Sequence, residues 1–365
     1  MFFFNVKDQI HLIKRQLNKR IDTIYNHGQF ILGPEVNVLE KKLAKIANTN
    51  HCLTVSSGTD ALLVSLMALN IKSGDEVITT SFSYISTAEV IVRLGAIPVF
   101  IDINKNDCLI DHKLIQQSIT KKTKAIIAVS LFGQAPDWDI INNIAKKNGN
   151  IPVIEDAAQS FGSEYKGYKS CGVSTIGCTS FFPTKPLSCF GDGGAIFTNN
   201  KKLFKKLLSL RVHGQIKKYE HEYIGVSARM DTIQCAVVLS KLKLFNNELK
   251  SRQRIAKIYD KAFQEMGIDY VKTNKKNKSA YALYCIFIKN RNKIQLLMKK
   301  ENIPSAVYYP KPMNKQKPYK KYDINSSINA CDVSMTILAI PMGPYLKLKD
   351  QNKIINFFKR NLKLC

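Results

Sequence analysis

The sequence predicts an α/β fold in which a mostly parallel sheet is sandwiched between helices. Short β-branched and apolar runs alternate with amphipathic helical patterns through the first two-thirds of the chain. Continuous apolar strands are typical of a sheet whose two faces are both buried by helices. The runs that we expect to form strands are EVITTSF (76–82), IPVFIDI (97–103), TKAIIAVSLF (123–132) and IPVIEDAA (151–158). The helices expected between them are TAEVIVRLGA (87–96) and DIINNIAKKNG (139–149).

The pattern changes after about residue 245, where we expect a second domain to start. ELKSRQRIAKIYDKAFQEMG (248–267) is typical of a long amphipathic helix that ends at a glycine. The elements expected after it are a strand at 281–290, a helix at 291–302, a strand at 303–309 and a last helix at 349–363. We therefore divide the chain into a large α/β domain, 1–245, and a smaller C-terminal α+β domain, 246–365. A chain of 365 residues with 45% hydrophobic residues is long enough for both.

The formal net charge of +27 raises the question of a nucleic-acid partner, because phosphate binding needs basic side chains. Lysine outnumbers arginine about five to one and is scattered along a chain that is also rich in Asn and Ile. Arginine, rather than lysine, makes bidentate contacts to phosphates and bases. We therefore expect a solvated basic surface that is compatible with an acidic small molecule such as a nucleotide diphosphate, and no nucleic-acid partner.

The nine cysteines form no C-x-x-C pair and no metal-ligand spacing, so we expect reduced, mostly buried thiols and no metal site. The apolar run at the start, MFFFNVKDQ, is too short for a signal peptide. No apolar run approaches the length that spans a membrane. These observations predict a soluble, cytoplasmic protein with no membrane partner.

Candidate site residues follow three of the expected strands, and ligands of open α/β sheets bind beyond the carboxyl ends of the strands. The first is HCLTVSSGTDAL (51–62), where Ser56-Ser57-Gly58-Thr59 stands between a short strand and an apolar helix. Hydroxyls and free backbone N–H groups at a helix start form a cup for an anion, and Gly58 lets a ligand approach the backbone closely. An ordinary helix N-cap is the alternative at this position.

The second strand end is IPVIEDAAQS, where Asp156 directly follows a buried run. A carboxylate at such a place is costly to bury unless it meets a partner. A protonated ring nitrogen of a ligand and a structural arginine are both suitable partners. Gln159 lies three residues further on and could reach the same ligand.

The third strand end is the segment FFPTKPLSCFGDGGA (181–195), which follows Ser180. Lys185 stands there between two prolines, with no neighbouring charge before Asp192. An amine nucleophile needs a lowered pKa, and the aromatic and proline neighbours supply an apolar setting that lowers it. A surface lysine whose stem lies over apolar residues is the alternative. An anion cup, an acid and an isolated amine are together what pyridoxal phosphate requires.

These motifs resemble the pyridoxal phosphate (PLP)-dependent sugar-nucleotide aminotransferases of the DegT/StrS type, which have the fold type I aminotransferase architecture. The resemblance runs nearly end to end. It rests on GQFILGPEV (28–36), SSGTDAL (56–62), GDEVITTSFSYISTAEV (74–90), PVIEDAAQSFG (152–162), SFFPTKPL (180–187), GDGGA (191–195), RMDTIQ (229–234) and YYPKPMNKQ (308–316).

The resemblance implies a role for each matching residue. Lys185 would bind the cofactor covalently and later move a proton between the cofactor and the sugar carbon. Asp156 would pair with the pyridine nitrogen. The remaining cofactor contacts that it implies are Tyr84 on the ring, Gln159 near the phenolic oxygen, and Gly58, Thr59 and Ser180 at the phosphate.

Members of this family complete each site with a second subunit, so the resemblance also implies a homodimer with shared active sites. Ser227 would reach the cofactor phosphate across the interface, and Arg229 would bind an acidic group of the substrate. Tyr308 and Tyr309 would contact the sugar. The resemblance implies no metal ion.

Three positions depart from the usual family pattern. Ser227 stands where Asn is common, and its shorter side chain would reach the phosphate through a water molecule. Ser188 stands where Gly is common, and it would be strained if this position has a positive φ. Tyr308 stands where His is frequent.

The segment VHGQIKKYEHEYIGVSARMDTIQ (212–234), and SFFPTKPL followed by Cys189, resemble most the enzymes that aminate C3 of UDP-2-acetamido-2-deoxy-3-oxo-glucuronate. That subgroup uses glutamate as donor and serves the synthesis of surface-polysaccharide (O-antigen-like) sugars. Arg229 would then bind the uronate or the glutamate carboxylate. The alternatives are a 4-aminotransferase of a UDP-4-keto-6-deoxy sugar and a PLP-binding regulator without catalytic activity. Related dehydratases carry His in place of the lysine, so Lys185 argues against that class.

Overall fold

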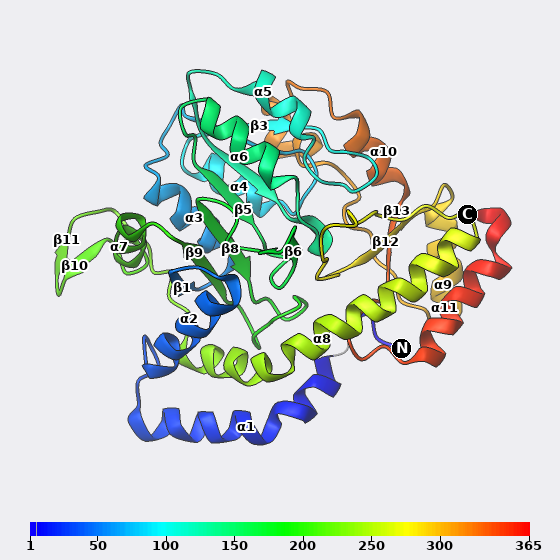
Figure 1. The fold of residues 1–365 in the computed structure, drawn as a ribbon, viewed down its shortest axis with the longest axis horizontal. Helices are drawn as coiled ribbons and strands as arrows, with labels where there is room; N and C mark the ends of the chain where they lie inside the picture. Colours follow the sequence, from blue (N-terminus) through cyan, green and yellow to red (C-terminus); the bar gives the residue numbers. More distant parts are fainter. Residues whose placement is uncertain (5) are drawn as a thin grey trace.

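A seven-stranded sheet forms the centre of the molecule, as the computed structural model of residues 1–4 and 6–365 shows (Figure 1). The strands, in spatial order, are β1 (His51–Val55), β9 (Gly194–Thr198), β8 (Ile176–Ser180), β5 (Val153–Asp156), β4 (Thr123–Val129), β2 (Glu76–Thr80) and β3 (Ile97–Ile101). Neighbouring strands pair in parallel except at β9, which is antiparallel to both β1 and β8. The prediction of a mostly parallel sheet is confirmed.

Helices cover both faces of this sheet. The helices on one face are α3 (Gly58–Ala68), α4 (Ser86–Arg93) and α7 (Lys201–Leu210), and those on the other are α2 (Pro34–Ala47), α6 (Trp138–Lys147) and the first part of α8 (Thr232–Glu265). Successive side chains of a strand point to opposite faces, so Val77 belongs to the core with α3 and Ile78 to the core with α6. The strands carry continuous apolar runs because both faces are buried.

The C-terminal part of the chain builds a second apolar core. The antiparallel strands β12 (Tyr284–Phe287) and β13 (Ile337–Ile340) pack there with α9 (Arg291–Lys300), α11 (Leu348–Arg360) and the second part of α8. Helix α8 is continuous through the expected boundary, because Phe245 belongs to the core of the large unit and Ile255 to that of the small one. The division at residue 245 stays a prediction, and one helix serves both cores.

Two expected elements differ from the structure. The long helix begins at Thr232 rather than near residue 248, because residues 235–241 are all buried and so show no amphipathic pattern. The strand expected at 303–309 is wrong, since its one backbone bridge pairs Ala306 with Ala339. Pro304 lacks the N–H group that a strand donates to its neighbour.

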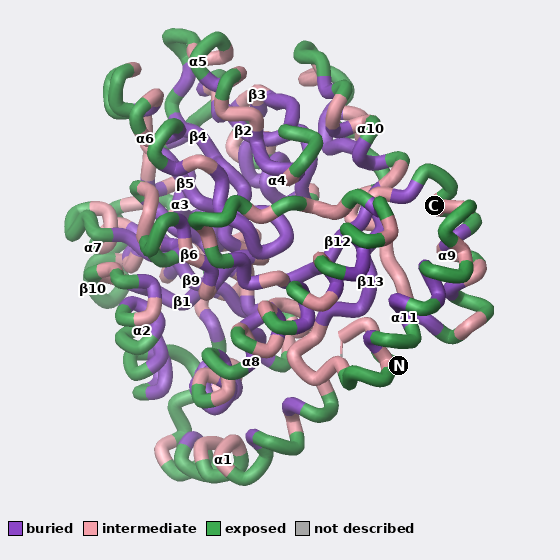
Figure 2. The backbone as a smooth tube through the Cα atoms, turned by 45° about the vertical axis from the view of Figure 1, so that its right-hand side comes forward, coloured by how far each residue is buried: buried purple, intermediate pink, exposed green. Residues whose placement is uncertain are grey.

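The remaining elements lie around the two cores. Helix α1 (Val6–His27) packs along α8, and Figure 2 shows that its outer surface is exposed whereas the central strands are buried. The other elements are α5 (Ile115–Ser118), α10 (Ile328–Thr336), the strand pairs β6 (Glu164–Tyr165) with β7 (Tyr168–Lys169) and β10 (Gln215–Lys217) with β11 (Glu220–His221), and 3₁₀ turns at 112–114, 131–133, 313–315, 317–322 and 362–364. All nine cysteines are free thiols, and seven of them are buried. Within residues 1–4 and 6–365, no helix is both long and apolar enough to cross a membrane.

A buried ion pair joins α2, β1 and the end of α7, and it provides a test of the fold. Arg211 Nη1 donates to Glu40 Oε1 at 2.6 Å and to the Thr54 carbonyl oxygen at 3.0 Å. Arg211→Leu leaves the Glu40 carboxylate buried without its cation, and such losses cost about 3–5 kcal/mol. We expect R211L to lower the urea midpoint of unfolding strongly.

The matched control is Arg360→Ala, which removes an exposed pair with Glu301. Because exposed pairs contribute at most about 1 kcal/mol, R360A should unfold close to the wild-type midpoint. Equal midpoints for the two variants would show that the Arg211–Glu40 pair does not stabilise the fold.

Candidate active site

Asp156 ends β5 with its carboxylate buried at the carboxyl edge of the sheet. Thr87 Oγ1, at the start of α4, donates to Asp156 Oδ2 at 2.8 Å, and the Ala158 N–H donates to Oδ1 at 3.2 Å. Burial raises the pKa of Asp156, while these two hydrogen bonds and the positive charge of Lys185 oppose the rise. Two donors leave the carboxylate free to accept a further bond from a ligand, and a cationic donor is favoured.

Lys185 lies in the loop between β8 and β9, where its backbone N–H donates to the Phe182 carbonyl oxygen at 2.9 Å. Burial lowers the pKa of Lys185 from 10.5 to about 8, and the negative charge of Asp156 opposes this shift. The two groups interact electrostatically, although no direct ion pair joins them among the described residues. The amine is thus neutral far more often than an exposed lysine, as a nucleophile must be.

The expected anion cup lies at the N-terminus of α3. Ser57 is the N-cap and accepts a hydrogen bond from the Asp60 N–H at 3.0 Å. The Ser56 and Ser57 hydroxyls donate to Asp60 Oδ2 at 2.6 and 2.9 Å, so both are already used. The first N–H groups of a helix have no intrahelical acceptor, and within the described chain no hydrogen bond uses those of Gly58 and Thr59. These N–H groups are the free donors of the cup.

A close backbone approach brings this cup against the end of β8. A Cβ atom added at Gly58 would lie 2.7 Å from Ser180 Cβ, which is closer than such atoms approach in proteins. The Ser180 hydroxyl accepts a hydrogen bond from the Phe182 N–H at 3.3 Å and keeps its own proton free to donate. Gly58, at the start of α3, and Ser180, at the end of β8, therefore lie directly against each other.

The side chains of Gln159, Tyr309 and Tyr84 meet beside Asp156. Gln159 Oε1 accepts from the Phe132 N–H at 2.8 Å, and Gln159 Nε2 donates to the Tyr309 hydroxyl at 3.2 Å. These bonds fix the orientation of the amide and leave one Nε2 hydrogen free. Burial raises the pKa of Tyr309, and its ring lies 6.4 Å from that of Tyr84 between centroids. Tyr84 is 58% exposed and presents an aromatic ring to an incoming molecule.

The other expected substrate and interface residues are Ser227, Arg229 and Tyr308. Arg229 Nη2 donates to Ser227 Oγ at 2.6 Å, and Ser227 is exposed. Within the described part of the chain, no hydrogen bond joins either residue to Lys185 or Asp156. The Tyr308 ring contacts the rings of Phe3 and Tyr309.

Ser188 does not have the strained backbone that the sequence suggested. Its φ angle lies outside the positive range, so a serine is tolerated there. Its hydroxyl is buried and accepts a hydrogen bond from Lys241 Nζ at 2.8 Å. Sequence reasoning missed both Lys241 and Thr87. The available signals were a single lysine in the apolar run CAVVLSK and a hydroxyl at a helix start three residues after Tyr84.

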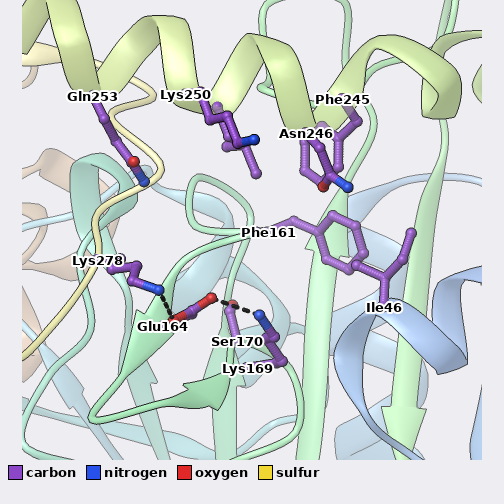
Figure 3. A pocket seen from close by; sticks show the side chains of 12 residues that line it. Ile46, Phe161, Glu164, Lys169, Ser170, Phe245, Asn246, Lys250, Gln253 and Lys278 are labelled. Carbon is purple, nitrogen blue, oxygen red and sulfur yellow. Dashed lines mark hydrogen bonds and ion pairs between the residues drawn. The ribbon is translucent and has the colours of Figure 1, made fainter.

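A pocket outside the candidate site lies between α8 and the β6–β7 hairpin (Figure 3). It has a volume of about 280 Å³, and Phe161 and Phe245 form part of its wall. Glu164 also lines this pocket, where its carboxylate forms ion pairs with Lys169 and Lys278. None of the predicted site residues lines it. Over residues 1–4 and 6–365, no group of His, Cys, Asp or Glu side chains is arranged to hold a metal ion.

Comparison with known proteins shows which protein family has this sequence and fold. The model of the DegT/DnrJ/EryC1/StrS aminotransferase family matches residues 11–359. A UDP-2-acetamido-2-deoxy-3-oxo-D-glucuronate aminotransferase of Pseudomonas aeruginosa is 46% identical over 345 residues, which are 94% of this chain and 95% of the relative. The crystal structure of a DegT DnrJ EryC1 StrS aminotransferase from Brucella abortus has a TM-score of 0.96 at 37% identity over 99% of both chains.

A second similar structure is that of NtdA from Bacillus subtilis with bound cofactor PMP. It has a TM-score of 0.89 at 27% identity, and the match covers 99% of this chain and 83% of that one. The fold type I architecture and the family resemblance are both confirmed. This chain belongs to the DegT/DnrJ/EryC1/StrS aminotransferase family.

Proposed function

We propose that this protein transfers an amino group from glutamate to C3 of UDP-2-acetamido-2-deoxy-3-oxo-glucuronate, with pyridoxal phosphate as cofactor. The observation that carries the proposal is the partly buried Lys185, the pKa of which is lowered to about 8, beside the buried carboxylate of Asp156 at the edge of the sheet. The choice of sugar is supported by the Pseudomonas relative, which is 46% identical over almost its whole length. The product is an amino sugar for a surface polysaccharide such as an O-antigen of lipopolysaccharide, made in the cytoplasm.

The residues of the site fit this cofactor. When bound, pyridoxal phosphate supplies an electron sink. The Asp156 carboxylate accepts a hydrogen bond from the protonated ring nitrogen, and its negative charge keeps that nitrogen protonated. The free N–H groups of Gly58 and Thr59, with the Ser180 hydroxyl, hold the phosphate at the N-terminus of α3. The exposed ring of Tyr84 would hold the cofactor ring by stacking.

Lys185 and Gln159 act on the reacting side of the cofactor. Lys185 would hold the cofactor through its neutral amine, and the same amine would carry the proton to and from the reacting carbon. Gln159 donates its free Nε2 hydrogen to the phenolic oxygen, in an orientation fixed by Phe132 and Tyr309. Tyr309 thus acts both through Gln159 and as a wall of the sugar site.

Arg229 and Ser227 would act at the active site of a second subunit. We place them at the site of the partner in a homodimer, where Ser227 reaches the phosphate and Arg229 binds the carboxylate of glutamate or of the uronate. Tyr308 contacts the sugar. Exposed apolar side chains, which mark interaction surfaces, occur nearby on the same segment and at the start of α2: Phe30, Ile31, Leu32, Tyr219 and Ile224.

The deciding experiment follows two half-reactions. Glutamate should convert the PLP-loaded protein to its amino form, and the isolated amino form should then aminate the 3-oxo-glucuronate nucleotide within one turnover. A preference for a UDP-4-keto-6-deoxy sugar would replace the substrate and keep the enzyme class. A protein that binds PLP but reacts with no amino donor would instead be a regulator.

Removing the Lys185 amine tests the catalytic assignment. We expect Lys185→Ala to lower turnover by about 10³-fold or more, because both covalent attachment and proton transfer are lost. Steady-state assays with the matched variant Lys121→Ala, which removes an exposed lysine, provide the control. Turnover of K185A at the wild-type rate would refute the assignment.

The lowered pKa of Lys185 predicts how the cofactor-free protein reacts with PLP. Below pH 8 the amine is mostly protonated, so the uptake rate should rise about tenfold per pH unit and level off above about pH 8 rather than near 10.5. Stopped-flow absorbance measures this rate. Asp156→Asn removes the charge that stabilises the ammonium, which lowers the pKa of Lys185 and moves the curve to lower pH. An uptake rate that still rises between pH 9 and pH 10 would contradict the assigned pKa.

The contact of Gly58 with Ser180 predicts the effect of adding one methyl group. Gly58→Ala must push the start of α3 away from β8, since the new Cβ would lie 2.7 Å from Ser180 Cβ. We expect PLP to bind about tenfold or more weakly, measured by equilibrium dialysis. The control is Gly343→Ala, whose Cβ would meet no atom within 4 Å. Equal affinities of the two variants would show that the cup does not hold the phosphate.

A further inference from the structure

Lys241 is a lysine that the fold buries completely. It lies on α8 with none of its surface exposed, in a stretch whose neighbours are apolar or small. Its Nζ donates to Ser188 Oγ at 2.8 Å and lies 4.7 Å from the centre of the Phe190 ring. Both contacts are with the loop that carries Lys185. The buried amine therefore touches that loop on the side facing α8.

Packing does not explain a lysine at this position. A buried ammonium group loses its hydration, and a methionine of similar length would fill the space without that cost. No carboxylate pairs directly with Lys241 in the described parts of the chain. Burial lowers the pKa of Lys241 to about 8, and its electrostatic interactions with Cys189 and Glu248 compensate only in part. A costly group kept beside a reacting group indicates a functional requirement.

The loop has few other anchors between Lys185 and the start of β9. The Cys189 N–H donates to the Phe181 carbonyl oxygen at 2.7 Å, which closes the loop with Lys185 near its tip. The Phe190 N–H donates to Gln234 Oε1 at 2.8 Å. For residues 186–188, Leu187 packs into the core of the large unit, and the bond from Lys241 to Ser188 is the one side-chain hydrogen bond that the structure records.

The same helix links this loop to more distant parts of the chain. About two turns beyond Lys241, Glu248 accepts hydrogen bonds from Gln9 and Tyr345. Glu248 and Arg252 share with Ser188 and the Lys185 segment the wall of a small cavity of about 30 Å³. The polar side chains of Lys241, Glu248 and Arg252 on α8 thus lie next to the loop that carries Lys185. Lys241 is the one of the three that forms a hydrogen bond with this loop.

We propose that Lys241 is a positioning residue for Lys185, acting through Ser188. It holds the returning arm of the loop so that the Lys185 side chain stays directed towards Asp156, and it touches neither cofactor nor substrate. The inference rests on the proposed function only in taking Lys185 as the amine that reacts with PLP.

The test compares Lys241→Met with Lys243→Met, which removes an exposed lysine of the same helix. The readout is the stopped-flow rate of PLP uptake by the cofactor-free protein at fixed pH, which requires neither glutamate nor sugar. We expect K241M to slow uptake between about tenfold and a hundredfold, the range for a misplaced reacting group. K243M should match the wild type. In turnover, K241M should lower kcat and leave KM nearly unchanged.

Unfolding measurements distinguish the proposed positioning role of Lys241 from a merely structural one. K241M should melt at the wild-type temperature or above it, because a buried charge is removed. R211L, which destabilises the fold by removing bonds to Glu40 and Thr54 rather than to the loop, should take up PLP at the wild-type rate. Equal slowing in K241M and R211L would overturn the proposal, and so would wild-type uptake in K241M.

Ser188 supplies the second variant. Ser188→Ala should slow uptake in the same direction as K241M, and the double variant should be no slower than K241M alone, since both act through one bond. If K241M does not fold, the S188A rate decides, and an unchanged rate refutes the proposal. A wild-type protein that takes up no PLP refutes the proposed function and this inference together. If the wild-type protein takes up PLP but does not aminate the 3-oxo-glucuronate nucleotide, only the substrate assignment is refuted.

Discussion

The burial of two adjacent carboxylates at the end of β5 is the constraint on which the site depends. Successive residues of a strand point to opposite faces, so Glu155 and Asp156 meet different surroundings. Glu155 accepts bonds from the hydroxyls of Ser130, Ser160 and Ser170 and from the Cys171 N–H, which satisfy it within the fold. Among residues 1–4 and 6–365, Asp156 receives two donors, and it interacts electrostatically with Lys185. The unsatisfied carboxylate is therefore the one available to a ligand, and its neighbour is structural.

Close backbone approaches fix where the other parts of the site lie relative to Asp156. A Cβ atom at Gly194 would lie 2.5 Å from the Ser57 carbonyl oxygen, and one at Gly58 would lie 2.7 Å from Ser180 Cβ. The start of α3, the end of β8 and the start of β9 can meet only because these glycines have no side chain. The lysine loop joins β8 to β9, so the same contacts place the loop beside the cup. The same backbone contacts thus determine the positions of both the N-terminus of α3 and the loop that carries Lys185.

The sequence predicted the layers of the fold and the grouping of Asp156, Lys185 and the Gly58 cup, because parallel strands end at a common edge. Each of these residues stands directly after an apolar run and is visible in a short window. Bonds between distant segments were not predictable in this way. Gln159 meets Tyr309 and Ser188 meets Lys241 only after the small unit and α8 have packed. The true start of α8 was missed for a related reason, since a fully buried helix shows no polar face.

Lys185, which is partly buried, and Lys241, which is fully buried, show that the same physical effect can serve two different roles. Burial lowers the pKa of both Lys185 and Lys241 to about 8. The charge of Asp156 acts on Lys185, and no hydrogen bond within the described chain uses its amine, so the amine can react. The Lys241 amine donates to Ser188 and lies against the Phe190 ring, so its lone pair and protons are directed within the protein. A lowered pKa alone therefore does not identify the reacting lysine. The decisive difference is whether the neutral amine is left without a partner on the side where a ligand enters.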